Sequence, residues 1–375
     1  MPAGASPDFP AIENIDDIPS PALIVFQERL EANLDRMVAI AGSVDRLRPH
    51  VKTTKMPEVV RLLQARGVRK VKCATIAEAE MCAGLGVEDV LLAYPVVGPG
   101  VVRLVQLVRT FPETTFRTIA DDPGAVADLS AAMAAWLPGR RLDVLVDLDT
   151  GMGRTGIAPG DDAVALARAI AEAPGLSLGG LHAYDGHIRD SDPDARAAAA
   201  EAAHAEVVAL RSRLDAEGLP VERVVASGTP TFAIHARRGD VECGPGTTTL
   251  WDASSRAAFS DLGFVQAAAV LCRVVSRPGT DRLCLDCGHK AVASEMPNPR
   301  VVIDALGPVE WVAHSEEHLV ARTPRASEFP VGTALLAAPW HICPTVALHA
   351  EAVVVEAGRA TRFSPVVARA RRLTT

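Results

Sequence analysis

Short apolar runs alternate with amphipathic stretches over residues 20–250. The apolar runs have the length of buried strands and lie at residues 47–51, 68–74, 89–94, 115–120, 142–149, 176–184, 223–227 and 240–244. Helix-like segments lie between most of them, at residues 57–65, 77–85, 125–136, 163–172 and 195–217. Eight strands that alternate with helices predict a (β/α)8 barrel of the TIM type, and an open doubly wound sheet is the alternative.

Local signals support several of the expected helix starts. Thr75 and Glu78 have the spacing of a capping box. Asp122 and Asp192 each stand before a proline at an expected first helical position. The eighth unit is the weakest, because residues 232–237 are too few for a regular helix.

The pattern changes after about residue 255. Strand-like runs separated by Pro, Gly and acidic turns lie at residues 267–276, 282–286, 301–304, 318–322 and 352–355, and no helical period persists. The early run 21–26 precedes the first barrel strand and can join the same sheet. We therefore expect a barrel over residues 27–252, and a smaller, mostly β domain formed by residues 1–26 and 253–375.

Charge and apolar content exclude two classes of partner. The formal net charge of −8 argues against nucleic acid, whose phosphate backbone requires a basic surface. No apolar run reaches the roughly 18 residues of a membrane span, so we expect no membrane association. Residues 1–17 have neither the basic nor the apolar region of a signal peptide. These features predict a cytoplasmic protein.

The cysteines fit the same compartment. Their number is seven, which is odd, and they are scattered along the chain, as in proteins of a reducing compartment. Cys284 and Cys287 have the spacing of a redox pair. Because they lie in a strand-like run, we favour buried structural thiols.

Lys52 stands just past the end of the first expected barrel strand. In a (β/α)8 barrel the catalytic groups lie at the carboxyl ends of the strands. A lysine there can lose its proton, because enclosure lowers the pKa of the amine, and it can then attack an aldehyde. Lys72, within the second strand, is the nearest competitor, and a solvated loop lysine is the alternative.

Two loops have the composition of a phosphate site. Barrels often bind phosphate after the seventh and eighth strands, and the loops in these two places are rich in glycine and hydroxyl side chains, which let N–H groups approach an anion. Ordinary turns also use these residues. The candidate residues are Ser227, Gly228 and Thr229 in the first loop and Gly244, Gly246 and Thr247 in the second.

Two further loops carry polar candidates. Arg154 lies in a glycine-rich loop after the fifth strand, where a guanidinium can contact a cofactor ring oxygen or a substrate carboxylate, although pairing with Asp147 or Asp149 is the alternative. Tyr184 ends the sixth strand, and His187 follows it as a candidate general base. A structural role is the alternative for the histidine.

His341 and Cys343 are the candidate metal ligands. They are two residues apart, so on a strand both side chains would face the same side. Imidazole and thiolate together are typical zinc ligands, but two ligands are an incomplete set that water and substrate would have to complete. A coincidental histidine and a buried cysteine are the alternative.

With these motifs identified, the chain resembles the D-threonine aldolase and D-serine dehydratase family of fold-type III pyridoxal phosphate enzymes, which are relatives of alanine racemase. The matching segments are residues 48–53, 72–80, 149–156, 227–231, 242–247 and 341–345. The resemblance implies that Lys52 holds pyridoxal 5'-phosphate as a Schiff base, that Arg154 and Tyr184 face its ring and that Thr229 and residues 244–247 hold its phosphate.

The same resemblance implies a homodimer with the active site at the subunit interface, and a divalent metal (zinc, manganese or magnesium) on His341 and Cys343. The substrate would be a small D-3-hydroxy amino acid, and the metal would bind its hydroxyl.

The resemblance also implies a lyase, and two reactions fit it. The run of motifs is more similar to the aldolases, which cleave the Cα–Cβ bond to give glycine and an aldehyde. His-x-Cys is associated with zinc-dependent dehydratases, which act on D-serine or 3-hydroxy-D-aspartate and give ammonia and a keto acid. A racemase is a weaker reading because it needs no metal pair, and a vitamin-carrier barrel is weaker because such carriers lack the second domain.

Overall fold

The computed structural model describes residues 9–371, and the chain divides into two compact units. One unit, here called the barrel unit, is formed chiefly by Met37–Lys52 and Pro57–Gly246. The other, the β unit, is formed by the residues up to Arg36, by Thr53–Met56 and by Thr247–Arg369. Residues 1–8 and 372–375, which the domain prediction assigned to the β-rich domain, lie outside the described residues, as does the start of the segment considered for a signal peptide.

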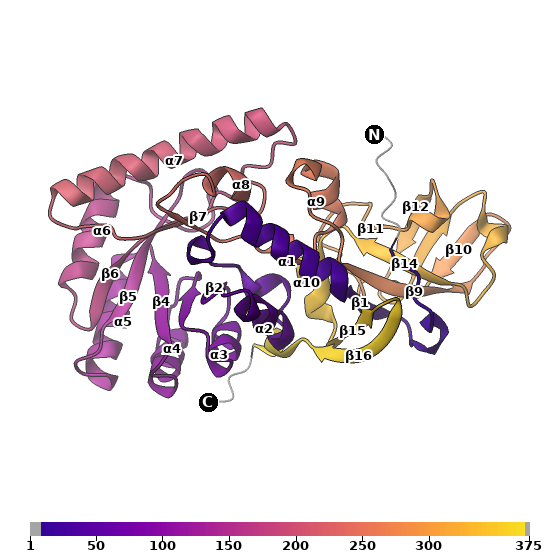
Figure 1. Cartoon of the computed structure of the whole chain (residues 1–375), viewed down its shortest axis with the longest axis horizontal. Helices are drawn as coiled ribbons and strands as arrows, with labels where there is room; N and C mark the ends of the chain where they lie inside the picture. Colours follow the sequence, from indigo (N-terminus) through magenta and orange to yellow (C-terminus); the bar gives the residue numbers. More distant parts are fainter. Residues whose placement is uncertain (1–8, 372–375) are drawn as a thin grey trace. The chain divides into compact units, whose positions relative to one another are not determined.

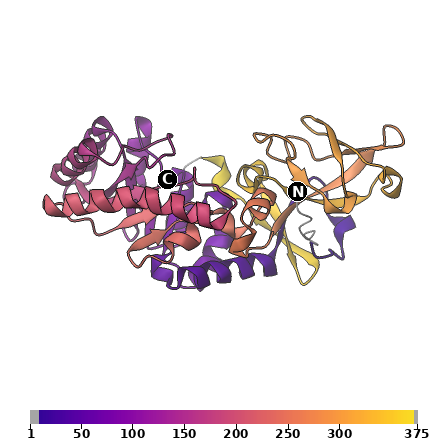
Figure 2. The same ribbon diagram turned by 90° about the horizontal axis from the view of Figure 1, so that it is seen from above.

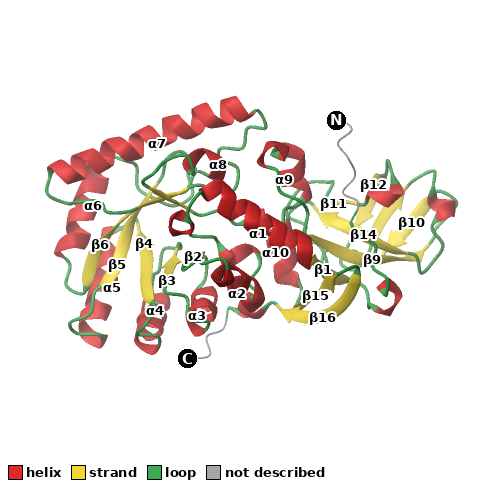
Figure 3. Ribbon diagram, in the orientation of Figure 1, coloured by secondary structure: helices red, strands yellow, loops and turns green. Residues whose placement is uncertain are grey.

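The barrel unit contains a parallel sheet in chain order. Its strands are β2 (Lys70–Cys73), β3 (Asp89–Leu92), β4 (Thr115–Ala120), β5 (Leu142–Leu148), β6 (Leu176–Ala183), β7 (Val224–Ala226) and β8 (Val241–Cys243). Their central residues are buried almost without exception, as expected for parallel strands that are covered on both faces. The helices lie outside these strands (Figures 1 and 3).

Residues 47–50 close this sheet into a barrel. Leu47 forms a parallel bridge with Cys243 of β8, and His50 forms one with Lys72 of β2. Three backbone hydrogen bonds accompany the bridges: Arg48 N–H donates to Cys243 O, His50 N–H donates to Pro245 O, and Lys72 N–H donates to Pro49 O. The (β/α)8 prediction is confirmed, with the first strand reduced to these bridges.

The helices follow the predicted alternation. They are α1 (Gln27–Ala41), α2 (Pro57–Ala65), α3 (Ile76–Gly84), α4 (Pro99–Thr110), α5 (Pro123–Trp136), α6 (Asp161–Glu172), α7 (Pro193–Ala216) and the single turn α8 (Phe232–His235). Figure 2 shows the length of α7. The expected caps form, because the side chain of Thr75 accepts from Glu78 N–H and that of Asp122 accepts from Ala125 N–H.

A cluster of ion pairs lies inside the barrel at the amino ends of the strands. Arg48 is completely buried and binds Asp89 of β3 and Glu242 of β8, each at 2.7 Å. Arg117 of β4 also binds Asp89, and Lys70 of β2 also binds Glu242. These pairs tie the closing segment directly to β8 and β3, and Lys70 of β2 shares Glu242 with Arg48.

The β unit contains a mixed sheet that includes the N-terminal strand. Its strands are β1 (Ala22–Phe26), β9 (Ala268–Ser276), β10 (Arg282–Leu285), β11 (Val301–Val302), β12 (Glu310–His314), β13 (Leu319–Arg322), β14 (Ala334–Pro339), β15 (Glu351–Glu356) and β16 (Arg359–Pro365). β1 pairs antiparallel with β9 and parallel with β15, as expected from the run 21–26. Two short helices, α9 (Ala253–Ala258) and α10 (Ile342–Leu348), correct the expectation that no helix follows residue 255.

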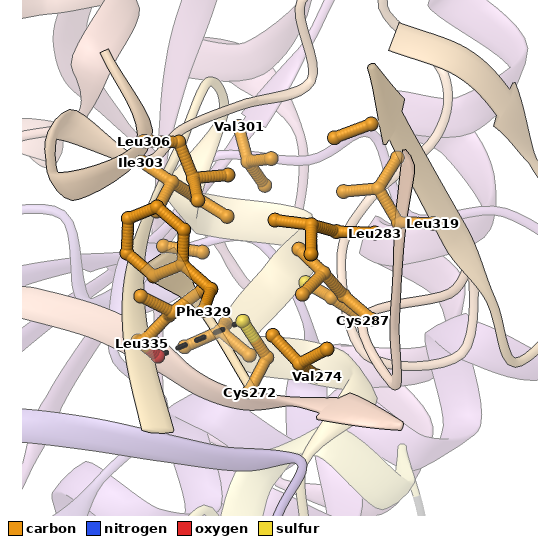
Figure 4. Packing of buried hydrophobic residues seen from close by; sticks show 14 of the residues in the cluster. Cys272, Val274, Leu283, Cys287, Val301, Ile303, Leu306, Leu319, Phe329 and Leu335 are labelled. Atoms are coloured by element: carbon orange, nitrogen blue, oxygen red, sulfur yellow. Dashed lines mark hydrogen bonds between the residues drawn. The ribbon is translucent and has the colours of Figure 1, made fainter. Parts of the chain in front are cut away.

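The core of the β unit packs around β9 and β10. Cys272, Val274, Leu283 and Cys287 contribute to one buried cluster, shown with Phe329 and Leu335 in Figure 4. Cys287, half of the possible redox pair, is fully buried there, and all seven cysteines are free thiols. A hydrogen bond with Cys287, together with burial, raises the pKa of the Cys272 thiol, so Cys272 is held in the unreactive protonated form.

No helix in residues 9–371 combines the length and apolar character that a bilayer span requires.

Replacing Arg48 by methionine tests the closure of the barrel. The substitution leaves the carboxylates of Asp89 and Glu242 without their buried partner, so we expect the free energy of unfolding to fall by about 3–5 kcal/mol. Urea denaturation followed by circular dichroism measures it. The control is Arg69→Ala, because the Arg69–Glu88 pair is more than 60% exposed on both sides and should contribute about 0–1 kcal/mol. Equal losses in the two variants would contradict the role given to the cluster.

Candidate functional site

Lys52 lies directly after the closing segment of the barrel. Residues Val51–Thr53 form one turn of 3-10 helix, so the chain leaves the barrel wall at the carboxyl end of residues 47–50. The Lys52 side chain is partly exposed, and its backbone N–H donates to Nδ1 of His50 at 3.4 Å. Its position fits the prediction for a catalytic amine, which must be enclosed yet accessible.

Three cationic groups converge on the ring of Tyr184. Lys52 Nζ lies 5.6 Å from the ring centroid, Lys72 Nζ lies 5.7 Å from it, and the guanidinium carbon of Arg154 lies 4.9 Å from it. Tyr184 directly follows β6, so all three cations meet at the carboxyl end of the barrel. Such a concentration of positive charge favours an anionic ligand.

Lys72 points into the barrel from β2 and is 2% exposed. Burial and the charge of Lys52 lower the pKa of its amine to about 7, although Asp185 and Asp147 act in the opposite direction. A Cβ atom added at Gly244 would lie 2.4 Å from Lys72 Nζ, so a larger residue at position 244 would displace the end of this lysine. Lys72 is therefore a chemically competent amine with little access, whereas Lys52 has access.

His50 is a functional candidate that the sequence analysis did not single out. It is 8% exposed, and burial together with the charges of Lys52 and Lys72 lowers the pKa of its imidazole well below the usual value. The ring is therefore neutral at physiological pH and is a weak base beside Lys52. Its only signal in the sequence is its place two residues before the lysine.

A second buried pair lies at the carboxyl ends of β5 and β6. His182 Nδ1 and Asp147 Oδ1 are 2.7 Å apart, and the Thr155 hydroxyl donates to Asp147 Oδ2 at 2.9 Å. Burial lowers the pKa of the His182 imidazole in spite of the Asp147 carboxylate. Asp147 is thus engaged by His182 and Thr155.

The loop of Arg154 is organised by Asp149. The carboxylate accepts from Gly151 N–H at 2.9 Å and from Gly153 N–H at 3.0 Å, and these hydrogen bonds lower the pKa of the carboxyl. Arg154 remains exposed, near the Tyr184 ring. His187 is exposed as well, and its Nε2 lies 2.9 Å from the point where a Cβ atom on Gly151 would stand.

The loops after β7 and β8 are hydrogen-bonded to each other. Ser227 adopts a left-handed φ of 77°, and its Oγ accepts from Gly244 N–H at 3.2 Å. Thr229 Oγ1 accepts from Gly246 N–H at 3.3 Å. These two hydrogen bonds join the two predicted phosphate loops.

Two members of the predicted phosphate set have other partners. The N–H of Gly228 donates to the buried carboxylate of Asp185 at 2.7 Å, so this amide is already engaged. Thr247 belongs to the β unit, where it begins a 3-10 turn, and its Oγ1 lies 3.8 Å from Cys343 Sγ.

The metal pair lies at the start of a helix, and its predicted placement on a strand is wrong. His341 is the N-cap of α10, and Cys343 lies in the first turn. His341 Nδ1 and Glu295 Oε1 are 2.5 Å apart, and the Thr53 hydroxyl is 3.2 Å from Cys343 Sγ. Burial opposes protonation of His341, but interaction with Cys343 and Glu295 outweighs it and raises its pKa to about 9.

These residues fit the groups that the sequence predicts. The barrel site offers a lysine in a cationic surrounding, which suits an anionic aldehyde. In the β unit, imidazole and thiol lie within hydrogen-bonding reach of each other, a donor pair that suits zinc. Among residues 9–371 no group of three or more His, Cys, Asp or Glu side chains is arranged to hold a metal, so the pair would supply two ligands only.

Known proteins match the chain over almost its whole length. Residues 25–248 match the family model of the alanine racemase N-terminal domain, and residues 267–355 match that of a serine dehydratase domain. The chain is 30% identical to D-threonine aldolase of Arthrobacter sp. over 365 residues, which cover 96% of this chain and 93% of the relative. It is 31% identical to 3-hydroxy-D-aspartate aldolase of Paracoccus denitrificans over 378 residues, which cover 96% and 95%.

A solved structure gives the same result. The crystal structure of D-threonine aldolase from Filomicrobium marinum superposes with a TM-score of 0.88 at 32% identity, covering 99% of this chain and 100% of that one. The barrel and the mostly β domain thus agree with the sequence comparisons. The chain belongs to the D-threonine aldolase and D-serine dehydratase family of fold-type III, pyridoxal phosphate-dependent lyases.

Proposed function

We propose that the protein is a pyridoxal phosphate- and divalent metal-dependent lyase that cleaves D-3-hydroxy amino acids to glycine and an aldehyde. The observation that carries the proposal is the similarity to two aldolases of this substrate class across 96% of the chain. The site geometry supports it, because an accessible lysine lies among cations at the carboxyl end of the barrel.

Lys52 is the proposed attachment point of the cofactor. When bound there, pyridoxal phosphate would accept the electron pair that the broken Cα–Cβ bond releases. Lys52 is partly exposed, whereas Lys72 is almost completely enclosed. Tyr184 and Arg154 would contact the ring, since they border the same space as the lysine.

The loops after β7 and β8 are the proposed phosphate site. The hydrogen bonds between the loops join Ser227 to Gly244 and Thr229 to Gly246. Gly228 remains part of the proposed site, although its N–H donates to Asp185. Thr247 remains a proposed contact of the phosphate, and only its position in the sequence supports this. Small residues permit the close approach of backbone to an anion.

Cleavage requires a base near the substrate's β-hydroxyl, because this hydroxyl loses its proton when the Cα–Cβ bond breaks and its oxygen becomes the aldehyde oxygen. We propose His187, whose exposed imidazole packs on Gly151 of the Arg154 loop, because imidazole exchanges protons readily near neutral pH. Tyr184 would position the reacting groups. His50, neutral and beside Lys52, is the second candidate base.

His341 and Cys343 are the proposed metal ligands. Glu295 engages Nδ1 of His341, which leaves Nε2 to bind a metal. A divalent ion there would lower the pKa of a substrate hydroxyl. A thiolate ligand favours zinc over manganese or magnesium.

The second candidate function is a dehydratase acting on D-serine or 3-hydroxy-D-aspartate. Two observations favour it: the His341–Cys343 pair, and the match of residues 267–355 to a serine dehydratase domain. The same binding groups serve both reactions, which differ in whether the Cα–Cβ bond or the Cα–H bond is broken.

We also propose that the protein is a cytoplasmic homodimer. Its seven free thiols support a reducing compartment. Two large apolar side chains next to the carboxyl end of β3, Tyr94 at 61% and Val97 at 64% exposed, support an interface between copies.

Product analysis tests the reaction. The protein, with pyridoxal phosphate and zinc or manganese, is incubated separately with D-threonine and with D-serine. We expect glycine and acetaldehyde from D-threonine in equal amounts, with no ammonia, because the bond that breaks is Cα–Cβ. Mass spectrometry and an ammonia assay identify the products. Ammonia and a keto acid would instead establish the dehydratase, and no turnover of either substrate would contradict both a D-threonine aldolase and a D-serine dehydratase.

Borohydride labelling tests the lysine. Reduction of the cofactor-loaded protein should fix the label on Lys52, because this amine combines access with a cationic surrounding. The label should disappear in Lys52→Ala. It should persist in Lys72→Met, the matched control that removes the neighbouring amine. Peptide mass spectrometry locates it, and a label on any other residue in the wild-type protein would rule out the assignment.

Glu295→Gln tests the metal pair by a readout independent of activity. Loss of the carboxylate that orients His341 should weaken zinc binding about 10–100-fold. Competition with a chromogenic chelator measures the affinity. Glu316→Gln is the control, because Glu316 lies in the same unit but forms an exposed pair with Lys290. Unchanged zinc affinity in Glu295→Gln would mean that His341 is not held in this way.

A further inference from the structure

Asp185 is a buried carboxylate that the proposed chemistry does not use. It follows Tyr184 at the carboxyl end of β6 and is 3% exposed. Three donors surround it: Gly228 N–H at 2.7 Å, the Thr231 hydroxyl at 2.8 Å and Nε2 of His235 at 2.8 Å. All three belong to the loop after β7 or to the helical turn α8 that ends it.

The carboxylate is ionised in this environment. Burial alone would raise the pKa of Asp185, but hydrogen bonds from His235, Thr231 and Gly228 N–H outweigh burial and lower it. An ionised carboxylate only accepts hydrogen bonds, so every contact fixes the direction of a donor on the loop. Thr231 and His235 are themselves 0% and 3% exposed, so water does not replace them as partners.

The influence of Asp185 extends through the first phosphate loop to the second. With Gly228 and Thr231 fixed, Ser227 is held in its left-handed conformation, and its Oγ accepts from Gly244 N–H. Thr229, the residue after Gly228, accepts from Gly246 N–H. A chain of hydrogen bonds therefore runs from the Asp185 carboxylate through the first loop to the second.

We propose that Asp185 is a positioning residue for the cofactor phosphate, and that it acts by fixing the loop of residues 227–231 from behind. This inference rests on the proposed function, since it requires a phosphorylated cofactor on Lys52. Its consequence is selective. Loss of Asp185 weakens the hold on the phosphate and leaves attachment of the aldehyde to Lys52 intact.

The experiment compares two aldehydes that differ only in the phosphate. The cofactor-free full-length protein is titrated with pyridoxal phosphate and with pyridoxal, and the absorbance change on covalent attachment gives both dissociation constants. For Asp185→Ala we expect the preference for pyridoxal phosphate over pyridoxal to fall about 10–100-fold, because a buried N–H and a hydroxyl lose their acceptor. Asp185→Asn keeps an acceptor for Gly228 N–H and should lie between this variant and the wild type.

Asp147→Asn is the matched control. Asp147 is also 3% exposed and also binds a histidine and a threonine, but neither of them belongs to the phosphate loops. Its preference for the phosphorylated aldehyde should stay within about twofold of the wild type. Thr231→Val, which removes one donor and keeps the carboxylate, gives a milder variant should Asp185→Ala fail to fold, and its preference should fall in the same direction.

Two outcomes would overturn the inference while leaving the proposed function intact. One is an equal loss of affinity for both aldehydes in the Asp185 and Thr231 variants, which would indicate a general structural role. The other is no change for either aldehyde. Failure of the wild-type protein to bind pyridoxal phosphate would be different, because it would remove the proposed function and the inference together.

Discussion

The site depends on how the barrel is closed. Residues 47–50 supply backbone hydrogen bonds to β8 and β2 in place of a full strand, and the Arg48 side chain anchors them beneath. His50 N–H donates to Pro245 O, within the loop after β8, so the segment that presents Lys52 and the proposed phosphate loop share a hydrogen bond. One short segment thereby fixes the positions of both the lysine and the loop. The buried ion pairs of Arg48 with two carboxylates hold this segment in place.

At the carboxyl end of the barrel, positive charges of the described residues lie close together without the ion pairs that stabilise Arg48 at the amino end. Lys52, Lys72 and Arg154 approach the same tyrosine ring, and burial of Lys72 beside Lys52 lowers the pKa of its amine to about 7. In the folded protein without ligand these groups repel one another. A dianionic ligand would offset this repulsion. The arrangement therefore lowers the stability of the ligand-free protein, while it favours binding of an anion and loss of the proton from Lys72.

The sequence predicted the parts that depend on local pattern. The alternation of apolar and amphipathic segments identified the barrel, and strand ends identified the loops at residues 227 and 244. The placement of His341 and Cys343 on a strand was wrong, because seven residues give too little helical period to recognise α10. The sequence analysis did not predict β12, because most of its residues are exposed and the strand therefore lacks a clear apolar pattern. Asp185 and Glu295 could not be predicted, since their partners, His235 and His341, lie about 50 residues away in sequence.

The buried pairs Asp147–His182 and Asp185–His235 differ in their surroundings. Both carboxylates raise the pKa of Lys72. Asp147 binds His182 and Thr155, neither of which belongs to the phosphate loops. Asp185 binds that loop through Gly228 and Thr231 and is the stronger of the two counter-charges to Lys72. The geometry of the loop and the charge of Lys72 are therefore coupled through Asp185. A movement of the loop that exposes this carboxylate would weaken its attraction for the Lys72 ammonium, and the pKa of Lys72 would fall further.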